Sequence, residues 1–362
     1  MLVEYYFPHA LSPSRLDRYL AGGWFRSGPS LFRAQVLCLN GDAHSVVNIR
    51  TQLENFTFSK SLRKLYNKNS RKFRFEMGIA RTNEACERLY QLQKHRFQGF
   101  IFDTLEEFLF AGDSEELFDT REIRVYDGDK LIAVSYFDLG NKSIASLLGL
   151  YDPEYESHSL GIYTMILEVY FGISNEMKYY YPGYILEDYP GFDYKLRIGN
   201  IQYYNWHGRW KPYHKLANEQ FILPEIHSRT LQIEQFLREH KLLYKKFLYP
   251  FFSVGYLSLL EEEFVKSVIF LQLDVRSIFD QDLQLIIEYI PDEGKYYLTW
   301  ARVNSDYTDF VKAEFSDGLF GGEVFRQGLL VREQILYQDK NPRRLVERAI
   351  KSLPSQPGLL VF

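Results

Sequence analysis

Hydrophobic and polar positions between residues 143 and 184 predict a strand, a turn, a helix and a second strand. Ile144 to Tyr151 is an apolar run of the length of a buried strand, and Asp152-Pro153 follows it as a turn signal. A helix is expected from about Ser159 to Met177, before an aromatic strand that ends at Gly183-Tyr184. A helix N-terminus after a buried strand presents backbone N–H groups to a ligand, and this arrangement suits acyl transfer.

The chain before this stretch shows two hairpin patterns. The first has strands at about residues 31–39 and 44–50 around Asn40-Gly41-Asp42, and the second runs from Arg121 to Asp138 around Asp127-Gly128. Helical spacing predicts two helices, over residues 11–20 and residues 82–98. This order of elements fits a mixed α/β domain with a central sheet.

The last 148 residues read as a separate unit. Periodic apolar positions predict helices over Gln232–Lys246, Leu257–Phe270 and Pro342–Leu353, and Lys295–Val303 alternates as a strand. The fold class is therefore expected to be α/β (α+β). The predicted division is a basic N-terminal region at residues 1–115, an acyl-transfer domain at 116–214 and a C-terminal extension of unknown role at 215–362.

The amino-acid composition and the absence of known motifs exclude several classes of functional site. The only cysteines, Cys38 and Cys86, are too few for a disulfide framework or a four-ligand zinc site, and they favour a reducing compartment. The eight histidines are scattered, and no Gly-rich nucleotide loop, G-x-S-x-G or H-E-x-x-H motif occurs. We therefore expect no metal and no cofactor. Without a signal peptide or an apolar run of about 18 residues, the prediction is a cytoplasmic protein with no membrane partner.

Charge is distributed unevenly along the chain. Residues 1–100 contain 16 Lys and Arg against 7 Asp and Glu, whereas residues 101–160 contain 4 against 14. Seven cations without an acidic residue lie between Ser59 and Phe75. Six of them are candidate contacts to nucleic-acid phosphates: Lys60, Arg63, Lys64, Lys68, Arg71 and Lys72. A solvated helix face is the alternative, but self-repulsion among the cations makes a polyanionic partner the stronger interpretation.

Several ordered motifs resemble the aminoacyl-tRNA–protein transferases, the arginyl and leucyl transferases of the N-degron pathway. In the second half they are Asp152-Pro153, Ser159-Leu160-Gly161-x-Tyr163, Tyr181-Pro182-Gly183-Tyr184 and Asp193-Tyr194-Lys195. In the first half they are Leu20 to Gly28, Ser59 to Lys64 with Asn67 and Asn69, and Leu89-Tyr90 through His95. The resemblance covers about residues 10–212. It departs from the family in lacking the N-terminal Cys cluster, in Pro182, in Phe192-Asp193 before Tyr194-Lys195, and in the C-terminal extension.

The resemblance implies a core like the GNAT acetyltransferases, in which two neighbouring strands splay apart and the acyl group reacts between them. The splayed pair would be the strand that ends at Tyr151 and the strand that ends at Tyr184. The implied enzyme is an aminoacyltransferase that moves Arg or Leu from charged tRNA, its co-substrate, to the N-terminal amine of an acceptor protein and so marks that protein for degradation. The implied partners are aminoacyl-tRNA and acceptor proteins or peptides.

The same resemblance suggests roles for individual residues. Asp152, Ser159 and Tyr184 are the expected catalytic residues, and the amides of Leu160 and Gly161 would stabilise an oxyanion. Lys195 and Arg197, with Arg63 second, would bind an acidic acceptor residue. Each has a structural alternative: Asp152 in an ordinary turn, Ser159 as an N-cap, Tyr184 in the core and Lys195 in solvent.

Two further functions stay open from the sequence. A GNAT-type N-acyltransferase using acyl-CoA would need an Arg/Gln-x-x-Gly-x-Gly/Ala loop at the helix entry, where this chain has His158-Ser159-Leu160-Gly161. A non-catalytic tRNA- or RNA-binding adaptor would need only the basic segment. Tests for transfer and for tRNA binding distinguish the three.

Overall fold

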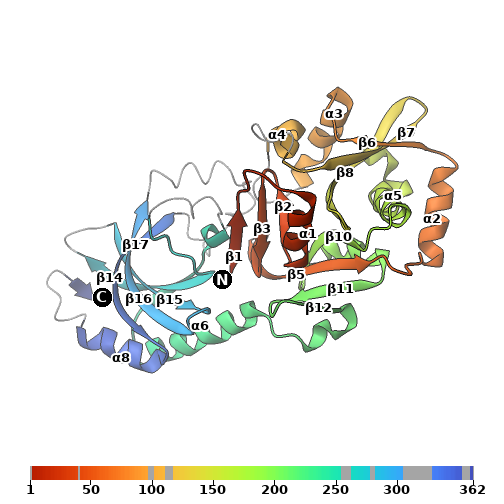
Figure 1. Cartoon of the computed structure of the whole chain (residues 1–362). Helices are drawn as coiled ribbons and strands as arrows, with labels where there is room; N and C mark the ends of the chain where they lie inside the picture. Colours follow the sequence, from red (N-terminus) through yellow and green to blue (C-terminus); the bar gives the residue numbers. More distant parts are fainter. Residues whose placement is uncertain are drawn as a thin grey trace.

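A computed structural model describes residues 2–39, 41–96, 102–110, 117–253, 262–277, 282–304, 328–352 and 359–361. Figure 1 shows two parts, a larger one built on a nine-stranded sheet and a smaller C-terminal one built on a six-stranded sheet. The helix α6, Ile222–Glu239, runs from one part toward the other.

A three-stranded sheet, ordered β1-β3-β2, lies at the N-terminus of the larger part. Its strands are Val3–Tyr6, Phe25–Ser27 and Ser30–Ala34, and α1, Pro13–Ala21, lies between β1 and β2 in the chain. Ser12 caps α1 by accepting a hydrogen bond from the Arg15 amide, and Pro13 occupies the first turn, where its missing N–H costs nothing. The helix predicted over residues 11–20 is thus confirmed.

The nine-stranded sheet has the order β12-β11-β5-β10-β9-β8-β7-β6, and β4 pairs with β5. These strands are β4 Val36–Leu39, β5 Asp42–Gln52, β6 Arg74–Ile79, β7 Thr120–Asp127, β8 Lys130–Leu139, β9 Ser143–Tyr151, β10 Tyr179–Leu186, β11 Ile201–Asn205 and β12 Arg209–Pro212. Both predicted hairpins are present, as β4–β5 and β7–β8, but the single strand predicted over residues 31–39 is wrong, because this range is divided between β3, which pairs with β1 and β2, and β4, which pairs with β5. The tight turn of the second uses Gly128 at φ +59°, a conformation that costs little without a Cβ.

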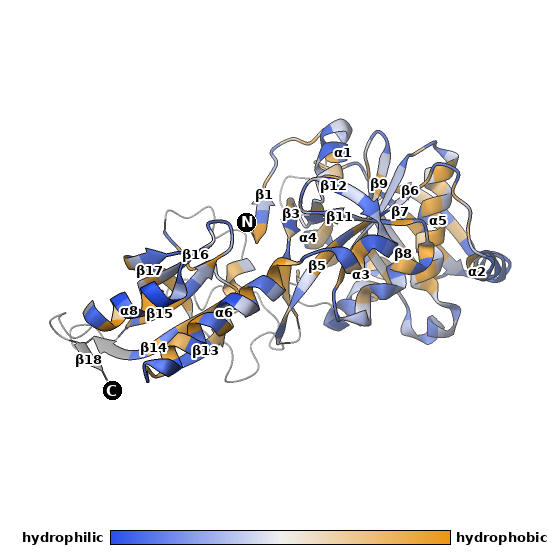
Figure 2. Cartoon of the chain, turned by 90° about the horizontal axis from the view of Figure 1, so that it is seen from below, coloured by the Kyte–Doolittle hydropathy of each residue, from blue (hydrophilic) through white to orange (hydrophobic). Residues whose placement is uncertain are grey.

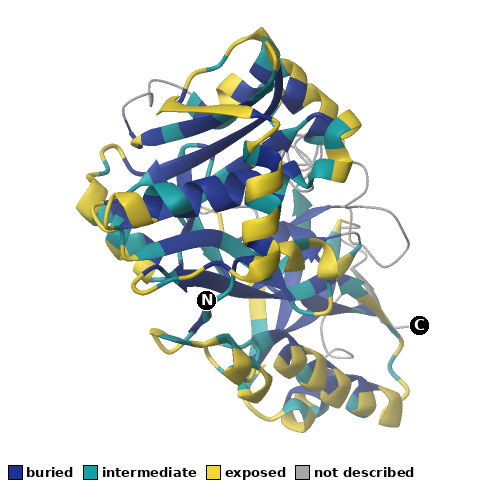
Figure 3. Ribbon diagram, turned by 90° about the vertical axis from the view of Figure 1, so that its right-hand side faces the viewer, coloured by how far each residue is buried: buried dark blue, intermediate teal, exposed yellow. Residues whose placement is uncertain are grey.

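Helices cover both faces of this sheet. The helix α5, Leu160–Ser174, packs with α2, Lys60–Ser70, on one face, where the core includes Ile123, Phe137 and Ile144. On the other face α3, Glu84–Gln93, and α4, Leu105–Phe110, pack on residues such as Val134 and Leu150. Figure 3 shows α5 as a mostly buried helix behind the exposed α2. Leu160–Ser174 is almost entirely apolar because it is enclosed by the sheet and α2.

The parallel strands β9 and β10 pair over only part of their length. Their register joins Tyr179 to Ser143, Tyr180 to Ile144 and Tyr181 to Ala145, and then ends. Beyond that point β9 continues to Tyr151 beside β8, while β10 shifts register across Pro182 and continues to Leu186 beside β5. The expected splaying of these two strands is therefore observed, and backbone groups on the inner edges of both strands lose their ladder partners there.

The C-terminal part is richer in strands than the sequence suggested. An antiparallel sheet ordered β13-β14-β15-β16-β17, with β18 paired to β14, packs against α6 and α8. Its elements are β13 Tyr244–Leu248, η5 Pro250–Ser253, β14 Ile269–Ser277, β15 Leu283–Ile290, β16 Lys295–Asn304, β17 Leu329–Asp339, α8 Pro342–Ser352 and β18 Leu359–Val361. Figure 2 shows that the hydrophobic residues of α6 and α8 are concentrated on one side of each helix.

Two predicted helices in this part need correction. The helix predicted over Gln232–Lys246 begins earlier, at Ile222, and ends at Glu239, because the chain turns at Lys241 with φ +58° and enters β13. The helix predicted over Leu257–Phe270 is wrong for its described residues, because Phe264 forms a bridge to Val331 and β14 begins at Ile269. Residues 257–261 lie outside the described residues.

The predicted domain boundaries stay predictions. The boundary at residues 115–116 lies outside the described residues, and strands from both sides of it share the nine-stranded sheet. The boundary at 214–215 falls within η4, Tyr213–Asn218. The two parts also share a hydrophobic core, in which Val36 and Cys38 of β4 pack with residues such as Ile226 and Phe251. Burial raises the pKa of Cys38 to about 12, so its thiol is a packing group.

Candidate functional site

The N-terminus of α5 lies directly after the end of β9. Ser159 has φ +50° and makes no side-chain capping bond, so the alternative of a conventional N-cap serine is not observed. Within the described residues, the amides of Leu160, Gly161 and Ile162 donate no hydrogen bond. The first bond of the helix runs from the Tyr163 amide to the Ser159 carbonyl. A Cβ on Gly161 would lie 3.9 Å from the Tyr151 ring, so the helix entry lies beside the last residue of β9.

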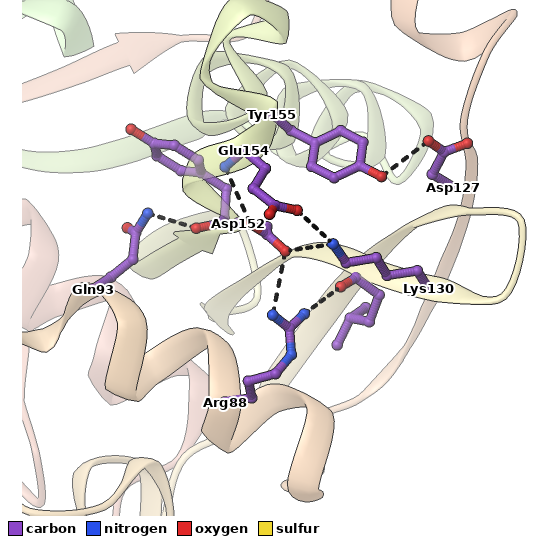
Figure 4. A network of polar contacts seen from close by, with 9 residues as sticks. Arg88, Gln93, Asp127, Lys130, Asp152, Glu154 and Tyr155 are labelled. Atoms are coloured by element: carbon purple, nitrogen blue, oxygen red, sulfur yellow. Dashed lines mark hydrogen bonds and ion pairs between the residues drawn. The ribbon is translucent and has the colours of Figure 1, made fainter.

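Asp152 is held by several donors at the end of β9 (Figure 4). Its carboxylate pairs with Lys130 at 3.0 Å and Arg88 at 3.2 Å, and it accepts a hydrogen bond from the Glu154 amide. Burial raises the pKa of Asp152, but the donors, led by Lys130, outweigh this effect and lower the pKa overall. Asp152 also caps η2, Pro153–His158. The structure thus places Asp152 in a network that joins β9 to β8 and α3; its catalytic role stays a prediction.

Lys195 lies on η3, Pro190–Ile198, and points back toward β10. Its Nζ donates a hydrogen bond of 2.9 Å to the Tyr184 carbonyl, beyond the point where β10 leaves β9. The Nζ lies 5.1 Å from the centroid of the Tyr184 ring and 4.8 Å from that of Phe192. No described carboxylate pairs with it, and burial lowers its pKa to about 7. Lys195 is therefore not the solvated lysine of the alternative interpretation.

Tyr184 packs in an aromatic cluster near the start of the chain. Its ring makes edge contacts with Phe25 and Phe32, and burial raises the pKa of its hydroxyl to about 12. Burial and the nearby Tyr184 raise the pKa of Tyr5 of β1, and Tyr5 donates a hydrogen bond to the Ser253 carbonyl. Tyr184 of the splayed strand β10 is thus linked through Tyr5 to Ser253 of the C-terminal part. Its role as a proton relay stays a prediction.

The six candidate phosphate contacts lie on or just after α2, and all are exposed. Lys60, Arg63, Lys64, Lys68 and Arg71 make no ion pair with a described residue, whereas Lys72 lies 3.3 Å from the His158 ring. The C-terminal end of α2 reaches the entry of α5, because Asn69 donates a hydrogen bond to the His158 carbonyl and Ser70 contacts Tyr163. Burial and the charges of Lys72 and Lys68 lower the pKa of His158. Cations that form no ion pair with a described residue therefore extend along α2 toward the N-terminal amides of α5.

The three predicted acceptor-binding residues are not brought together. Arg197 is exposed at the end of η3, and no ion pair of a described residue includes it. Arg63 lies on α2 and acts electrostatically on Tyr170 of α5. Of the three, Lys195 alone lies against the splayed strands.

A buried carboxylate was missed by the sequence interpretation. Glu168 of α5 has 0% exposure and accepts a hydrogen bond of 2.8 Å from the hydroxyl of Tyr180, a residue of the last paired segment of β10. Burial raises the pKa of Glu168 to about 7. The available signal was its position as the only ionisable carboxylate or cation in the apolar helix Leu160–Ser174.

The described residues were also compared with the requirements of a metal site and of a membrane-spanning helix. No group of three or more His, Cys, Asp or Glu side chains within the described ranges could hold a metal ion. Among the helices that the structure describes, none combines the length and the apolarity that crossing a membrane requires.

A family model described as "Arginine-tRNA-protein transferase, C terminus" matches residues 64–205, which include α2 from Lys64 onward, Asp152, α5 and Lys195. This part of the chain is therefore similar to the aminoacyl-tRNA–protein transferase family. Among relatives in this family, the "Aspartate/glutamate leucyltransferase" of Leptospira interrogans is 28% identical over 201 residues, covering 53% of this chain and 76% of the relative. The enzyme of that name from Vibrio cholerae is 24% identical over 197 residues, covering 54% and 82%. That from a Shewanella species is 29% identical over 191 residues, covering 51% and 76%.

The solved structures that resemble this chain are less similar to it in sequence than these relatives are. L-PGS from Bacillus licheniformis has a TM-score of 0.33 and 13% identity, covering 49% of this chain and 51% of that one. FemX has a TM-score of 0.34 and 8% identity, covering 51% and 64%. The mixed sheet, the helix between β9 and β10 and the splaying of those strands agree with the GNAT-like core expected from the sequence.

Proposed function

We propose that the protein is an aminoacyl-tRNA–protein transferase that moves Leu or Arg from charged tRNA to the N-terminal amine of an acceptor protein and so marks it for degradation. The observation that carries this proposal is the juxtaposition of unpaired cations on α2 with the uncapped N-terminus of α5, beside the point where β9 and β10 separate. The names of the relatives support the same activity.

The reaction is aminolysis of an ester that is already activated. The acceptor nitrogen attacks the ester carbonyl carbon, a C–N bond forms, and the bond between that carbon and the ribose oxygen of tRNA breaks. The amides of Leu160 and Gly161 are suited to stabilise the negative charge that develops on the carbonyl oxygen. Positioning supplies most of the acceleration, and the reaction needs no cofactor besides charged tRNA.

Lys195 is the residue best placed to select an acidic acceptor. It is the cation of η3 that contacts β10, it has no carboxylate partner among the described residues, and its Nζ lies against the rings of Tyr184 and Phe192. A carboxylate from an N-terminal Asp or Glu would complete an ion pair there, which matches the acceptors in the relatives' name. The extra charge would also favour the protonated form of Lys195.

A transfer assay tests the proposal. The purified protein is mixed with tRNA charged with labelled Leu or Arg and with peptides that begin with Asp, Glu, Lys or Arg. Transfer to the Asp and Glu peptides supports the proposal. Binding of tRNA without transfer to any peptide would favour a non-catalytic adaptor, and acylation from acyl-CoA alone would favour the GNAT N-acyltransferase.

A further inference from the structure

The strand β6 forms one edge of the nine-stranded sheet (Figure 1). It pairs with β7 in a register without shifts, from Arg74 opposite Tyr126 to Ile79 opposite Arg121. All six of its residues are exposed, and no strand among the described residues pairs with its second side. An uncovered edge of this kind offers its backbone groups to another extended chain.

The pairing with β7 shows which backbone groups of β6 face outward. The Ala80 amide donates a hydrogen bond of 3.0 Å to the Thr120 carbonyl. Because hydrogen-bonded pairs alternate in an antiparallel ladder, the even-numbered residues of β6 direct their backbone groups toward β7. The three residues between and after them direct their N–H and C=O groups away from β7, and these groups have no hydrogen-bond partner within the described part of the chain. These three edge residues are Phe75, Met77 and Ile79.

The side chains of the edge residues form an apolar row on the face of the sheet that carries α2 and α5. Two of their neighbours on β7, Ile123 and Val125, belong to the core beneath these helices. The exposed fraction rises from 3% at Phe73 to between 36% and 60% across the edge residues. The core thus continues uncovered to the edge of the sheet, and an added strand with apolar residues at alternate positions would extend it.

The other edge strands of the two large sheets carry features that discourage strand addition. The strand β12 has four residues and ends at Pro212, and β13 carries the exposed Lys245 and Lys246. The strand β17 has two shifts of register against β16. None of these features occurs in β6, whose sequence is RFEMGI, so its edge is the best suited of the four to accept another strand.

The charges around β6 decide between possible occupants. Residues 71–81 contain one anion, Glu76, and four cations, which are Arg71, Lys72, Arg74 and Arg81. A second copy of the chain, paired antiparallel so that all edge residues meet, would bring its Arg81 between Lys72 and Arg74, and this repulsion is unfavourable. An extended segment with acidic residues at both ends meets the cations favourably. Two of these cations, Arg74 and Arg81, lie outside the set assigned to tRNA.

We propose that the free edge of β6 binds an extended acidic segment of a partner protein as an added strand. The backbone of the segment bonds to the outward groups of the edge residues, its alternate apolar side chains cover the apolar row, and its acidic ends meet the cations. The inference goes beyond the transferase function and does not depend on it, since β7 and β8 separate β6 from the splayed strands.

Fluorescence anisotropy with a labelled peptide tests the inference. The peptide carries three Val residues at alternate positions, separated by Thr, and two Glu residues at each end. A second peptide has N-methyl groups on the Val amides, which removes backbone bonding but keeps the charges and the apolar row. We expect the wild-type protein to bind the first peptide at least about 10-fold more tightly than the N-methylated peptide or a peptide with Lys in place of Glu.

The variants M77P and F75T/I79T test the edge itself, with I335T as the matched control. Proline at Met77 removes an outward N–H and leaves the bonds to β7, so the sheet should stay folded. F75T/I79T keeps every backbone group and reports on the apolar row even if M77P fails to fold. Ile335 is also an exposed strand residue, on β17. Both β6 variants should weaken peptide binding by roughly 10-fold or more, and I335T should bind like the wild type.

Several results would overturn the inference. They are no binding of the acidic peptide by the wild-type protein, equal binding of the N-methylated or the Lys peptide, and wild-type affinity in F75T/I79T. A wild-type dimer in sedimentation analysis that M77P converts to a monomer would also overturn it, because a second copy would then occupy the edge. Transfer from charged tRNA to short peptides should be the same in M77P and wild type, so failure of the transferase function leaves this test unaffected.

Discussion

Lys195 donates a hydrogen bond of 2.9 Å to the backbone carbonyl of Tyr184, so a potential cation lies against the strand that leaves the parallel pair. Burial lowers the pKa of Lys195 to about 7, because no carboxylate among the described residues compensates its charge. An acidic acceptor would supply that missing charge, and this relationship leads to the first prediction.

Replacing Lys195 with Met should reduce kcat/KM for peptides that begin with Asp or Glu by roughly 10- to 100-fold, the value of a charge-assisted hydrogen bond. The loss should appear mainly in the peptide KM. Because the folded lysine loses its proton as the pH rises through about 7, the wild-type KM for acidic peptides should also rise above that pH. Steady-state transfer assays check both expectations. K178M removes an exposed lysine elsewhere and should change neither; an unaltered KM in K195M would remove Lys195 from acceptor binding.

The triple variant K60A/R63A/K64A on α2 should weaken tRNA binding and reduce the slope of log K against log salt by roughly one unit per lost phosphate contact. The reason is that these side chains are exposed and have no acidic partner among the described residues, so they are free to replace counterions on tRNA. Filter binding at several salt concentrations measures the slope. The control R343A/R344A/R348A removes the same charge from α8, where Arg343 and Arg348 pair with acidic residues, and should leave the slope near the wild-type value. Equal slopes for wild type and the α2 variant would contradict the assignment.

Glu168 makes stability depend on pH in a direction that can be measured. Burial raises its pKa from 4.5 to about 7, so the folded protein retains a proton that the unfolded chain has already released within this window. The associated stability is complete below a pH of about 4.5 and is lost as the pH rises to about 7. E168Q should therefore gain up to roughly 3 kcal/mol of unfolding free energy over wild type at pH 8, with no comparable gain at pH 4. Urea denaturation at the two pH values gives the comparison, and a loss of stability in E168Q at pH 8 would refute the burial of a charged Glu168.

Asp152 holds the end of β9 through Lys130 and Arg88, so D152N should lower the melting temperature by roughly 2–6 °C. Its lowered pKa means that this contribution is present at neutral pH and disappears as the pH falls through the folded pKa, so the difference between D152N and wild type should vanish in acid. Thermal denaturation at pH 7 and at a series of pH values below 3.8 measures it. A double R88A/K130A variant should lose the same stability as D152N. If D152N kept the wild-type melting temperature but lost transfer, Asp152 would act on substrate and not on the network.

The sequence was most informative where local pattern and tertiary structure agree. Ile144–Tyr151 is long, apolar and bounded by Asp152-Pro153, and the helix after Ser159 has no competing strand pattern, so the order β9, α5, β10 could be predicted. The segment Leu257–Phe270 has helical spacing that also suits a buried strand. Its pairing with β13 and β15, which are distant in the sequence, decides for the strand from Ile269.

The candidate site was only partly predictable for a related reason. Lys195 and α2 carry visible signals, an ordered motif and a run of cations, and both lie near the splayed strands. Glu168 carries no comparable signal, because its burial and its oxygen without a hydrogen-bond partner among the described residues arise only when β8, β9 and β10 pack against α5. A single carboxylate in an apolar helix indicates burial, but not what it faces.

The central claim is tested most directly by single-turnover transfer from labelled Leu-tRNA or Arg-tRNA to a peptide with N-terminal Asp or Glu, with wild type and K195M measured side by side. The account predicts a labelled peptide with wild-type protein, at a rate that depends on the acidic first residue, and much less product with K195M. Tight binding of charged tRNA by the wild-type protein, with no labelled peptide from either donor, would contradict it.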